Sequence, residues 1–133
     1  MPLYHRFPSK RKINRMNARQ RKKFHLGEFQ ALIFGVSGCL FSKWHTAEYG
    51  DQFLDEVIAF VEANSMYMYG GGIGEFSFGF KSANSPSLTV QQRQMVIDWF
   101  VQRDDVQHLC AGDLIDGYYA DEAEFERYDQ TYK

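Results

Sequence analysis

The chain has 133 residues, of which 44% are hydrophobic and 17% aromatic, so it can build the core of one domain and wholesale disorder is excluded. Its longest apolar run, residues 31–36, is too short to cross a membrane. The net charge of −2 hides an asymmetry. Residues 1–23 hold nine of the fifteen Lys and Arg residues and no acid, whereas the rest of the chain carries six bases and all seventeen acids. This pattern predicts a basic arm of charge +9 joined to a body of charge −11.

The cysteine content and the N-terminus both indicate a cytoplasmic protein. Cys39 and Cys110 are too few for a disulfide framework, and both lie in apolar stretches, so we expect reduced thiols in a reducing compartment. The N-terminus lacks the apolar segment of a secretory signal. Charge alone rarely anchors a protein to a membrane, and no second anchoring signal is visible, so we expect no membrane partner.

The basic arm, residues 1–23, shows no apolar periodicity. Like charges four residues apart, Arg15 with Arg19 and Arg19 with Lys23, oppose a free helix. We therefore expect a flexible arm that becomes ordered when a polyanion neutralises its charge.

The body begins with a strand at residues 28–41 that is apolar on both faces, which is typical of the middle of a sheet. Thr46 is expected to cap a helix that runs to about Asn64. Two short strands then flank the glycine cluster at residues 70–72. The cluster lacks the Lys-Ser or Lys-Thr of a phosphate-binding loop, so it predicts a hairpin.

The second half of the body completes the pattern. Phe76, Phe78 and Phe80 share one face of a strand and are expected in the core. Thr89 followed by Gln92 is a capping-box pattern that begins a second helix, and residues 106–119 read as the last strand. The order β-α-β-β-α-β predicts an α+β fold, a two-layer ferredoxin-like sandwich with an antiparallel sheet and two helices on one face. We expect three parts: the flexible basic arm at 1–23, a single α+β domain at 24–119 and an acidic C-terminal tail at 120–133.

No pattern points to a catalytic or metal centre. The four histidines show no ligand spacing, so we expect no metal and no cofactor. The acid pairs Asp104/Asp105 and Asp113/Asp116 have no evident nucleophile or base beside them, so we expect solvated acids and no enzymatic activity.

The C-terminal tail is strongly acidic. Arg127 is its only base within residues 121–129, among five acids: Asp121, Glu122, Glu124, Glu126 and Asp129. Two interpretations stay open, a solvated helical tail and an intramolecular polyanion that competes with RNA for the basic arm.

The most specific motif straddles the boundary between arm and body. Residues 17–30 read NARQRKKFHLGEFQ, a basic cluster followed by His25 and by a Glu-Phe-Gln that enters a strand. This segment resembles the N-terminal signature of the YggL-type family, small bacterial proteins that bind the large (50S) ribosomal subunit. Weaker similarity continues through residues 69–74, 96–103 and 114–119. The chain departs from the family pattern at Ala31, where an acid is common, and at Tyr118 and Tyr119, where tryptophans are common.

The resemblance implies a non-catalytic accessory factor of the 50S subunit, with the basic arm on rRNA phosphates. A contact between the acidic body and a basic ribosomal protein stays open. Composition by itself supports only polyanion binding. The RNA-binding candidates are Arg11, Lys12, Arg15, Arg19, Arg21, Lys22, Lys23 and His25. Relatives begin at about Met16, and an arm that started there would keep four bases. We expect a monomer, and a protein-interaction module or a small-ligand domain, even an enzyme, on the same fold stays open as the alternative.

Overall fold

The computed structural model describes residues 7–120, 122–125 and 127–133. Its helices are α1 (Lys10–Arg15), α2 (Ala18–Phe24), α3 (Ala47–Ala63), α4 (Val90–Val101) and α5 (Glu122–Phe125). Its strands are β1 (Leu32–Leu40), β2 (Met66–Gly71), β3 (Glu75–Ser82), β4 (Val106–Ala111), β5 (Ile115–Asp116) and β6 (Gln130–Thr131). Two short 3-10 helices, Gly27–Phe29 and Ser42–Trp44, flank β1.

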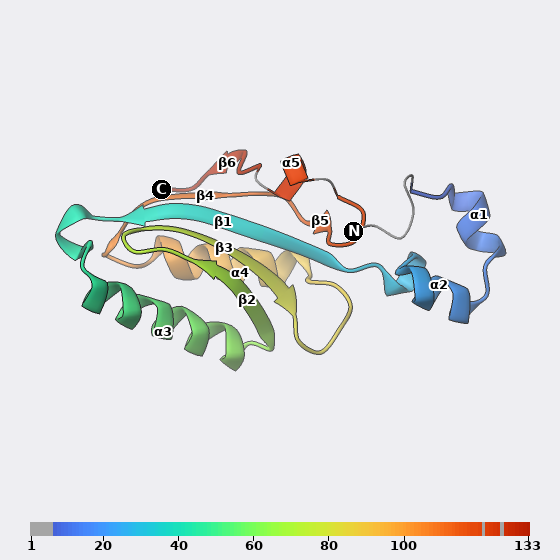
Figure 1. Cartoon of the computed structure of the whole chain (residues 1–133), viewed down its shortest axis with the longest axis horizontal. Helices are drawn as coiled ribbons and strands as arrows, with labels where there is room; N and C mark the ends of the chain where they lie inside the picture. The colour runs from blue at the N-terminus through green and yellow to red at the C-terminus, as the bar shows by residue number, and fades with distance from the viewer. Residues whose placement is uncertain (1–6, 121, 126) are drawn as a thin grey trace.

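The described strands form one open antiparallel sheet of six strands, seen in Figure 1. The strand order is β2-β3-β1-β4-β6, and β5 pairs with the start of β1. The expectation that the first strand lies in the middle of the sheet is confirmed, because β1 pairs with β3 on one side and with β4 and β5 on the other. The predicted mixed helix-and-strand class with an antiparallel sheet is also confirmed.

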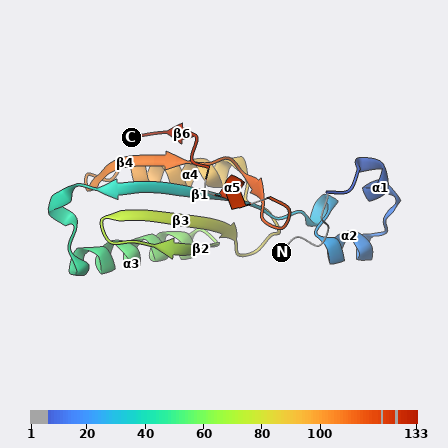
Figure 2. The same ribbon diagram turned by 45° about the horizontal axis from the view of Figure 1, so that its top comes forward.

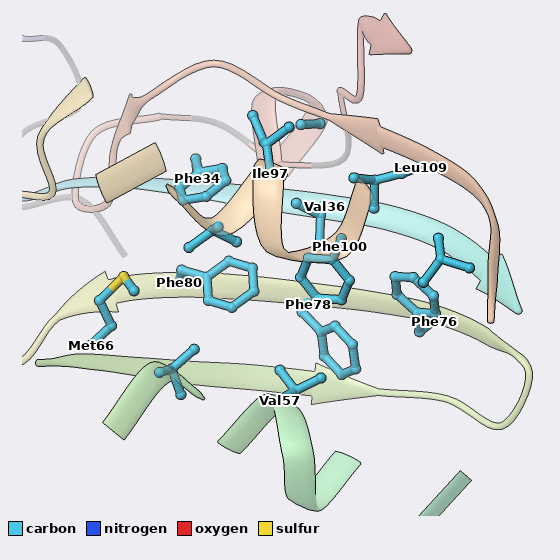
Figure 3. Packing of buried hydrophobic residues seen from close by; sticks show 14 of the residues in the cluster. Phe34, Val36, Val57, Met66, Phe76, Phe78, Phe80, Ile97, Phe100 and Leu109 are labelled. Atoms are coloured by element: carbon cyan, nitrogen blue, oxygen red, sulfur yellow. The ribbon is translucent and has the colours of Figure 1, made fainter. Parts of the chain in front are cut away.

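Helices α3 and α4 pack on one face of the sheet, as the turned view in Figure 2 shows. Alternate residues of β1 and β3 point into the core between the two layers. The close-up in Figure 3 shows these buried side chains, which include Phe34, Val36, Val57, Phe76, Phe78, Phe80, Ile97 and Phe100. The prediction of a core role for the three phenylalanines of β3 is confirmed, since each is at most 4% exposed.

Both long helices begin where local sequence signals place them. The Thr46 side chain accepts a hydrogen bond from the backbone N–H of Tyr49. Thr89 and Gln92 form the reciprocal capping box at the start of α4. These caps satisfy amide groups that have no partner within the helix, which explains why a short polar residue marks each start.

The glycine cluster forms a β-hairpin between β2 and β3, as predicted. Gly70 and Gly72 have φ of +104° and +141°, and a Cβ on either would approach a β3 carbonyl oxygen to 2.2 Å or less. Only glycine fits this conformation without strain. The cluster therefore closes a hairpin and does not open a helix at a phosphate site.

The last predicted strand, residues 106–119, is interrupted in the structure. Both β4 and β5 pair with β1, but the chain leaves the ladder between them. At the break, the Arg93 Nε donates to the carbonyl of Gly112 at 2.9 Å, while the Gly112 N–H donates to Gly35. The Gly112 carbonyl thus accepts a hydrogen bond from an α4 side chain instead of from a neighbouring strand.

The end of the C-terminal segment packs on the body, which contradicts the interpretation as a solvated helical tail. Its competition with RNA for the basic arm stays a prediction. Strand β6 pairs with β4, and Tyr132 packs against the core. Arg93 donates from Nη2 to the Gln130 side-chain oxygen at 2.9 Å, and the Lys133 Nζ donates to the carbonyls of Val101 and Arg103. These contacts depend on residues far apart in the sequence, so the acidic composition alone did not reveal them. Asp121 and Glu126 lie outside the described residues.

Candidate nucleic-acid interface

The basic segment, residues 10–25, projects beyond the N-terminal end of β1 and away from the sheet (Figures 1 and 2). It consists of α1, a short turn and α2. We expected no regular structure here, so the two helices are a correction to that prediction. Arg6 lies outside the described residues.

Capping explains why helices form despite the like charges. Asn17 accepts from the Gln20 N–H at 2.9 Å, and the Gln20 side chain accepts from the Asn17 N–H at 3.0 Å. At the start of α1, the Ser9 side chain accepts a single hydrogen bond from the N–H of Lys12. A cap of this kind is worth about 1 kcal/mol, more than the few tenths that a like-charge pair costs on a helix surface.

Arg21 differs from the other bases of the segment. Its Nε donates to the Glu28 carboxylate at 2.7 Å, and its Nη1 donates to the Met16 carbonyl. Only 23% of its side chain is exposed. Its guanidinium thus ties together residues on either side of α2. The RNA contact that we predicted at Arg21 stays a prediction, and it would compete with these bonds.

His25 and two tyrosines join the basic segment to the body. The His25 ring stacks on Tyr118, with centroids 3.6 Å apart and planes 7° apart. The Tyr119 hydroxyl donates to the Phe24 carbonyl at 2.5 Å, and the Phe7 ring packs edge-on against Tyr119. His25 itself ends α2 in the left-handed conformation, with φ of +53°. Tyr118 and Tyr119 thus hold the segment in place.

The remaining bases of the segment are exposed to solvent: Lys10, Arg11, Lys12, Arg15, Arg19, Lys22 and Lys23. Arg19, Lys22 and Lys23 follow an i, i+3, i+4 spacing, which places them on one side of α2. No acid occurs between residues 7 and 25. Chemically, such a surface can neutralise several phosphates at once and release their counterions.

A groove of about 580 Å³ lies beside α2, on the sheet face opposite α3 and α4. Lys22 and His25 of the basic segment line it together with Tyr118. The body contributes Tyr67, Tyr69 and Lys81 from β2 and β3, and these were not among our predicted site residues. The alternation Met66-Tyr67-Met68-Tyr69 was the available signal, because the methionines face inward and the tyrosines outward.

The acid pair Asp104/Asp105 is only half solvated, which corrects our expectation. Asp105 is 6% exposed and accepts from Arg103 at 2.8 Å and from the Tyr49 hydroxyl at 2.5 Å. Burial would raise the pKa of Asp105, but the hydrogen bonds from Arg103 and Tyr49 outweigh it and lower that pKa. Arg103 also pairs with Glu56 at 2.9 Å. This cluster joins the start of α3 to the end of α4 and has a structural role.

The described part of the chain offers no metal centre and no membrane helix. No group of three or more His, Cys, Asp or Glu side chains is placed there to hold a metal ion. Cys39 and Cys110 are free and half-buried. None of the described helices is long and apolar enough to span a bilayer.

Comparison with protein families defines the class to which this antiparallel α+β body and its basic segment belong. The family model described as YggL 50S ribosome-binding protein matches residues 18–119, which include α2, the joining tyrosines and the sheet through β5. The chain therefore belongs to the YggL 50S ribosome-binding protein family, and the predicted resemblance is confirmed. Comparison with curated proteins and with solved structures gave no match.

Proposed function

We propose that the protein is a non-catalytic accessory factor that binds the 50S subunit by contacts between its basic segment and rRNA phosphates. The family name indicates 50S binding. The observation that supports the phosphate contacts is the set of exposed bases on α1 and α2, with no acid among residues 7–25, beside an acidic body. We assign the contacts to Arg11, Lys12, Arg15, Arg19, Lys22 and Lys23, with Arg21 and His25 holding the segment in position.

The proposal also covers the location of the protein, the partner of its acidic body and its fold type. A ribosome-binding role implies a cytoplasmic location. The acidic body is suited to face a basic ribosomal protein while the basic segment faces rRNA. The order β2-β3-β1-β4 with α3 and α4 on one face supports a ferredoxin-like sandwich, to which β5 and β6 are additions.

The experiment is co-sedimentation of the purified protein with isolated 50S subunits at low salt. The test variant is Arg19→Gln/Lys23→Gln, which removes two exposed charges and keeps good helix formers. The matched control is Lys43→Gln/Arg127→Gln, which removes two exposed charges from the body. We expect weaker pelleting of the test variant only. Equal pelleting of both variants and the native protein would reject the phosphate contacts, and absence of the native protein from the pellet would reject 50S binding.

A further inference from the structure

We propose that the groove between α2 and the open sheet face binds an unpaired RNA base by aromatic stacking, with Lys22 and Lys81 on the flanking phosphates. This inference deepens the proposed function and rests on it, because it names the form of RNA that the body would recognise. The aromatic and basic side chains that line the groove are Lys22, His25, Phe29, Tyr67, Tyr69, Lys81 and Tyr118.

The groove presents aromatic rings to solvent. Tyr67 is 54% exposed, Tyr69 is 49% and Tyr118 is 39%, although one face of the Tyr118 ring is covered by His25. Three partly exposed rings around one hollow are unusual for side chains that serve only the core. Planar rings at the edge of a basic surface are the groups on which single-stranded RNA bases stack.

The charges around the groove favour a polyanion. Lys22 lies on the α2 side and Lys81 on the sheet side, with the Lys81 ammonium 5.6 Å from the Tyr67 ring centre. None of the described residues that line the groove is acidic. An adjacent hollow on the same sheet face instead includes two acids, Asp113 and Glu124, and one base, Arg127. The body is acidic as a whole, whereas this hollow combines Lys81 of the body with Lys22 of the basic segment and contains no acid, so its charge suits nucleic acid.

The position of the Tyr69 ring depends on a glycine in the neighbouring strand. Tyr69 of β2 pairs with Gly79 of β3, and a Cβ on Gly79 would lie 2.0 Å from Cζ of the Tyr69 ring. The missing side chain therefore leaves room for the ring to lie across the neighbouring strand. Because the conflicting atoms belong to the end of a side chain, an alanine at Gly79 would displace the ring and leave the backbone in place.

The groove forms a continuous surface with the proposed phosphate contacts. Lys22 belongs to both, since it lies on the exposed side of α2 and also lines the groove. An RNA strand bound along α2 would thus reach Tyr67 without a gap in the contact surface. A protein segment could also pack on the aromatic rings, but it would give the two lysines a negatively charged partner only if it were itself acidic. An rRNA strand carries a negative charge at every phosphate.

The experiment measures binding of the full chain to two RNA probes, a single-stranded hexaadenylate and an RNA duplex of the same strand length. The variants are Tyr67→Leu, which removes the ring, Tyr67→Phe, which keeps it, and Gly79→Ala, which displaces Tyr69. The control is Phe41→Leu, a 41% exposed ring at the other end of β1. We expect Tyr67→Leu to weaken hexaadenylate binding about five-fold or more, because stacking contributes strongly per base. Tyr67→Phe and Phe41→Leu should bind like the native protein, and Gly79→Ala should bind more weakly.

The outcomes separate this inference from the proposed function. If both Tyr67→Leu and Gly79→Ala bound hexaadenylate like the native protein, the proposal that the groove binds an unpaired base would be wrong. It would also be wrong if Tyr67→Leu lost as much affinity for the duplex as for hexaadenylate. If Tyr67→Leu lost 50S binding while the native protein did not bind hexaadenylate, the groove would bind a ribosomal protein and the inference would be wrong. Failure of the phosphate contacts shows instead in Arg19→Gln/Lys23→Gln, which leaves Tyr67 intact.

Discussion

The imidazole of His25 lies parallel to the phenol ring of Tyr118, at a centroid distance of 3.6 Å. The two residues are 93 positions apart, so one aromatic stack joins the end of α2 to the segment after β5. This contact fixes where the basic surface stands relative to the sheet. It also turns a charged segment, which the sequence alone would leave flexible, into a positioned surface.

Removal of the stack should loosen the basic segment. We expect Tyr118→Ala to speed trypsin cleavage after Arg19, Lys22 and Lys23 by about two- to twelve-fold, because an aromatic pair contributes about 0.5–1.5 kcal/mol. Tyr118→Phe should be cleaved at the native rate. Limited proteolysis followed by mass spectrometry gives the rates, and equal rates for Tyr118→Ala and native protein would show that the stack does not hold the segment.

The bases of α2 should differ in their effect on salt dependence. We expect Lys23→Gln to reduce the slope of log affinity against log salt by about one, since each phosphate contact releases roughly one counterion. Arg21→Gln should change the slope less, because Glu28 already holds the Arg21 guanidinium. Titrations of 50S subunits at several salt concentrations give both slopes. A larger change for Arg21→Gln than for Lys23→Gln would contradict these roles.

Asp105 should make stability depend on acid pH. Burial raises its pKa, but the hydrogen bonds from Arg103 and Tyr49 more than compensate, so the folded pKa lies below the ordinary value of 3.8. Its contribution is therefore present above about pH 4 and is lost as the pH falls through the lower folded pKa. We expect Asp105→Asn to lower the free energy of unfolding at pH 7 by about 2–3 kcal/mol.

Urea unfolding at pH 7 and pH 3 measures this effect. The difference between native protein and Asp105→Asn should shrink at pH 3. Asp104→Asn, at the exposed neighbour, is the control and should change stability little at either pH. A difference that is the same at both pH values would show that Asp105 is not ionised in the folded protein.

The last four residues should stabilise the body. A chain ending at Asp129 loses the pairing of β6 with β4 and the packing of Tyr132. We expect its free energy of unfolding to fall by about 2–4 kcal/mol. Lys133→Gln removes only the two hydrogen bonds of the ammonium group and should cost less. Denaturant unfolding compares the two, and native stability in the shortened chain would support the solvated tail that the composition first indicated.

The features predicted from sequence are those that local patterns determine. Thr46 and Thr89 begin the long helices because each supplies a cap within its own turn. The central place of β1 follows from apolar residues on both faces. The helix at residues 18–24 also begins at a local signal, the capping pair Asn17 and Gln20, which our prediction of a flexible arm did not take into account.

The rest depends on contacts that no local pattern reveals. Gln130 and Tyr132 join the body because Arg93 of α4 reaches them, 37 and 39 residues away in the chain. The groove likewise needs the pairing of Tyr67 with Lys81 and the approach of Lys22 from α2. For the site, the sequence identified the basic cluster but not that Arg21 makes structural contacts within it. It also gave the outward-facing tyrosines of β2 no role.

The salt dependence of 50S binding tests the central claim most directly. If the six assigned bases together neutralise about four to five phosphates, the logarithm of the affinity should fall with the logarithm of salt at a slope of roughly −3 to −4. Arg19→Gln/Lys23→Gln should reduce the magnitude of that slope by about two. An affinity for isolated 50S subunits that did not change with salt, in the native protein, would contradict binding through rRNA phosphates.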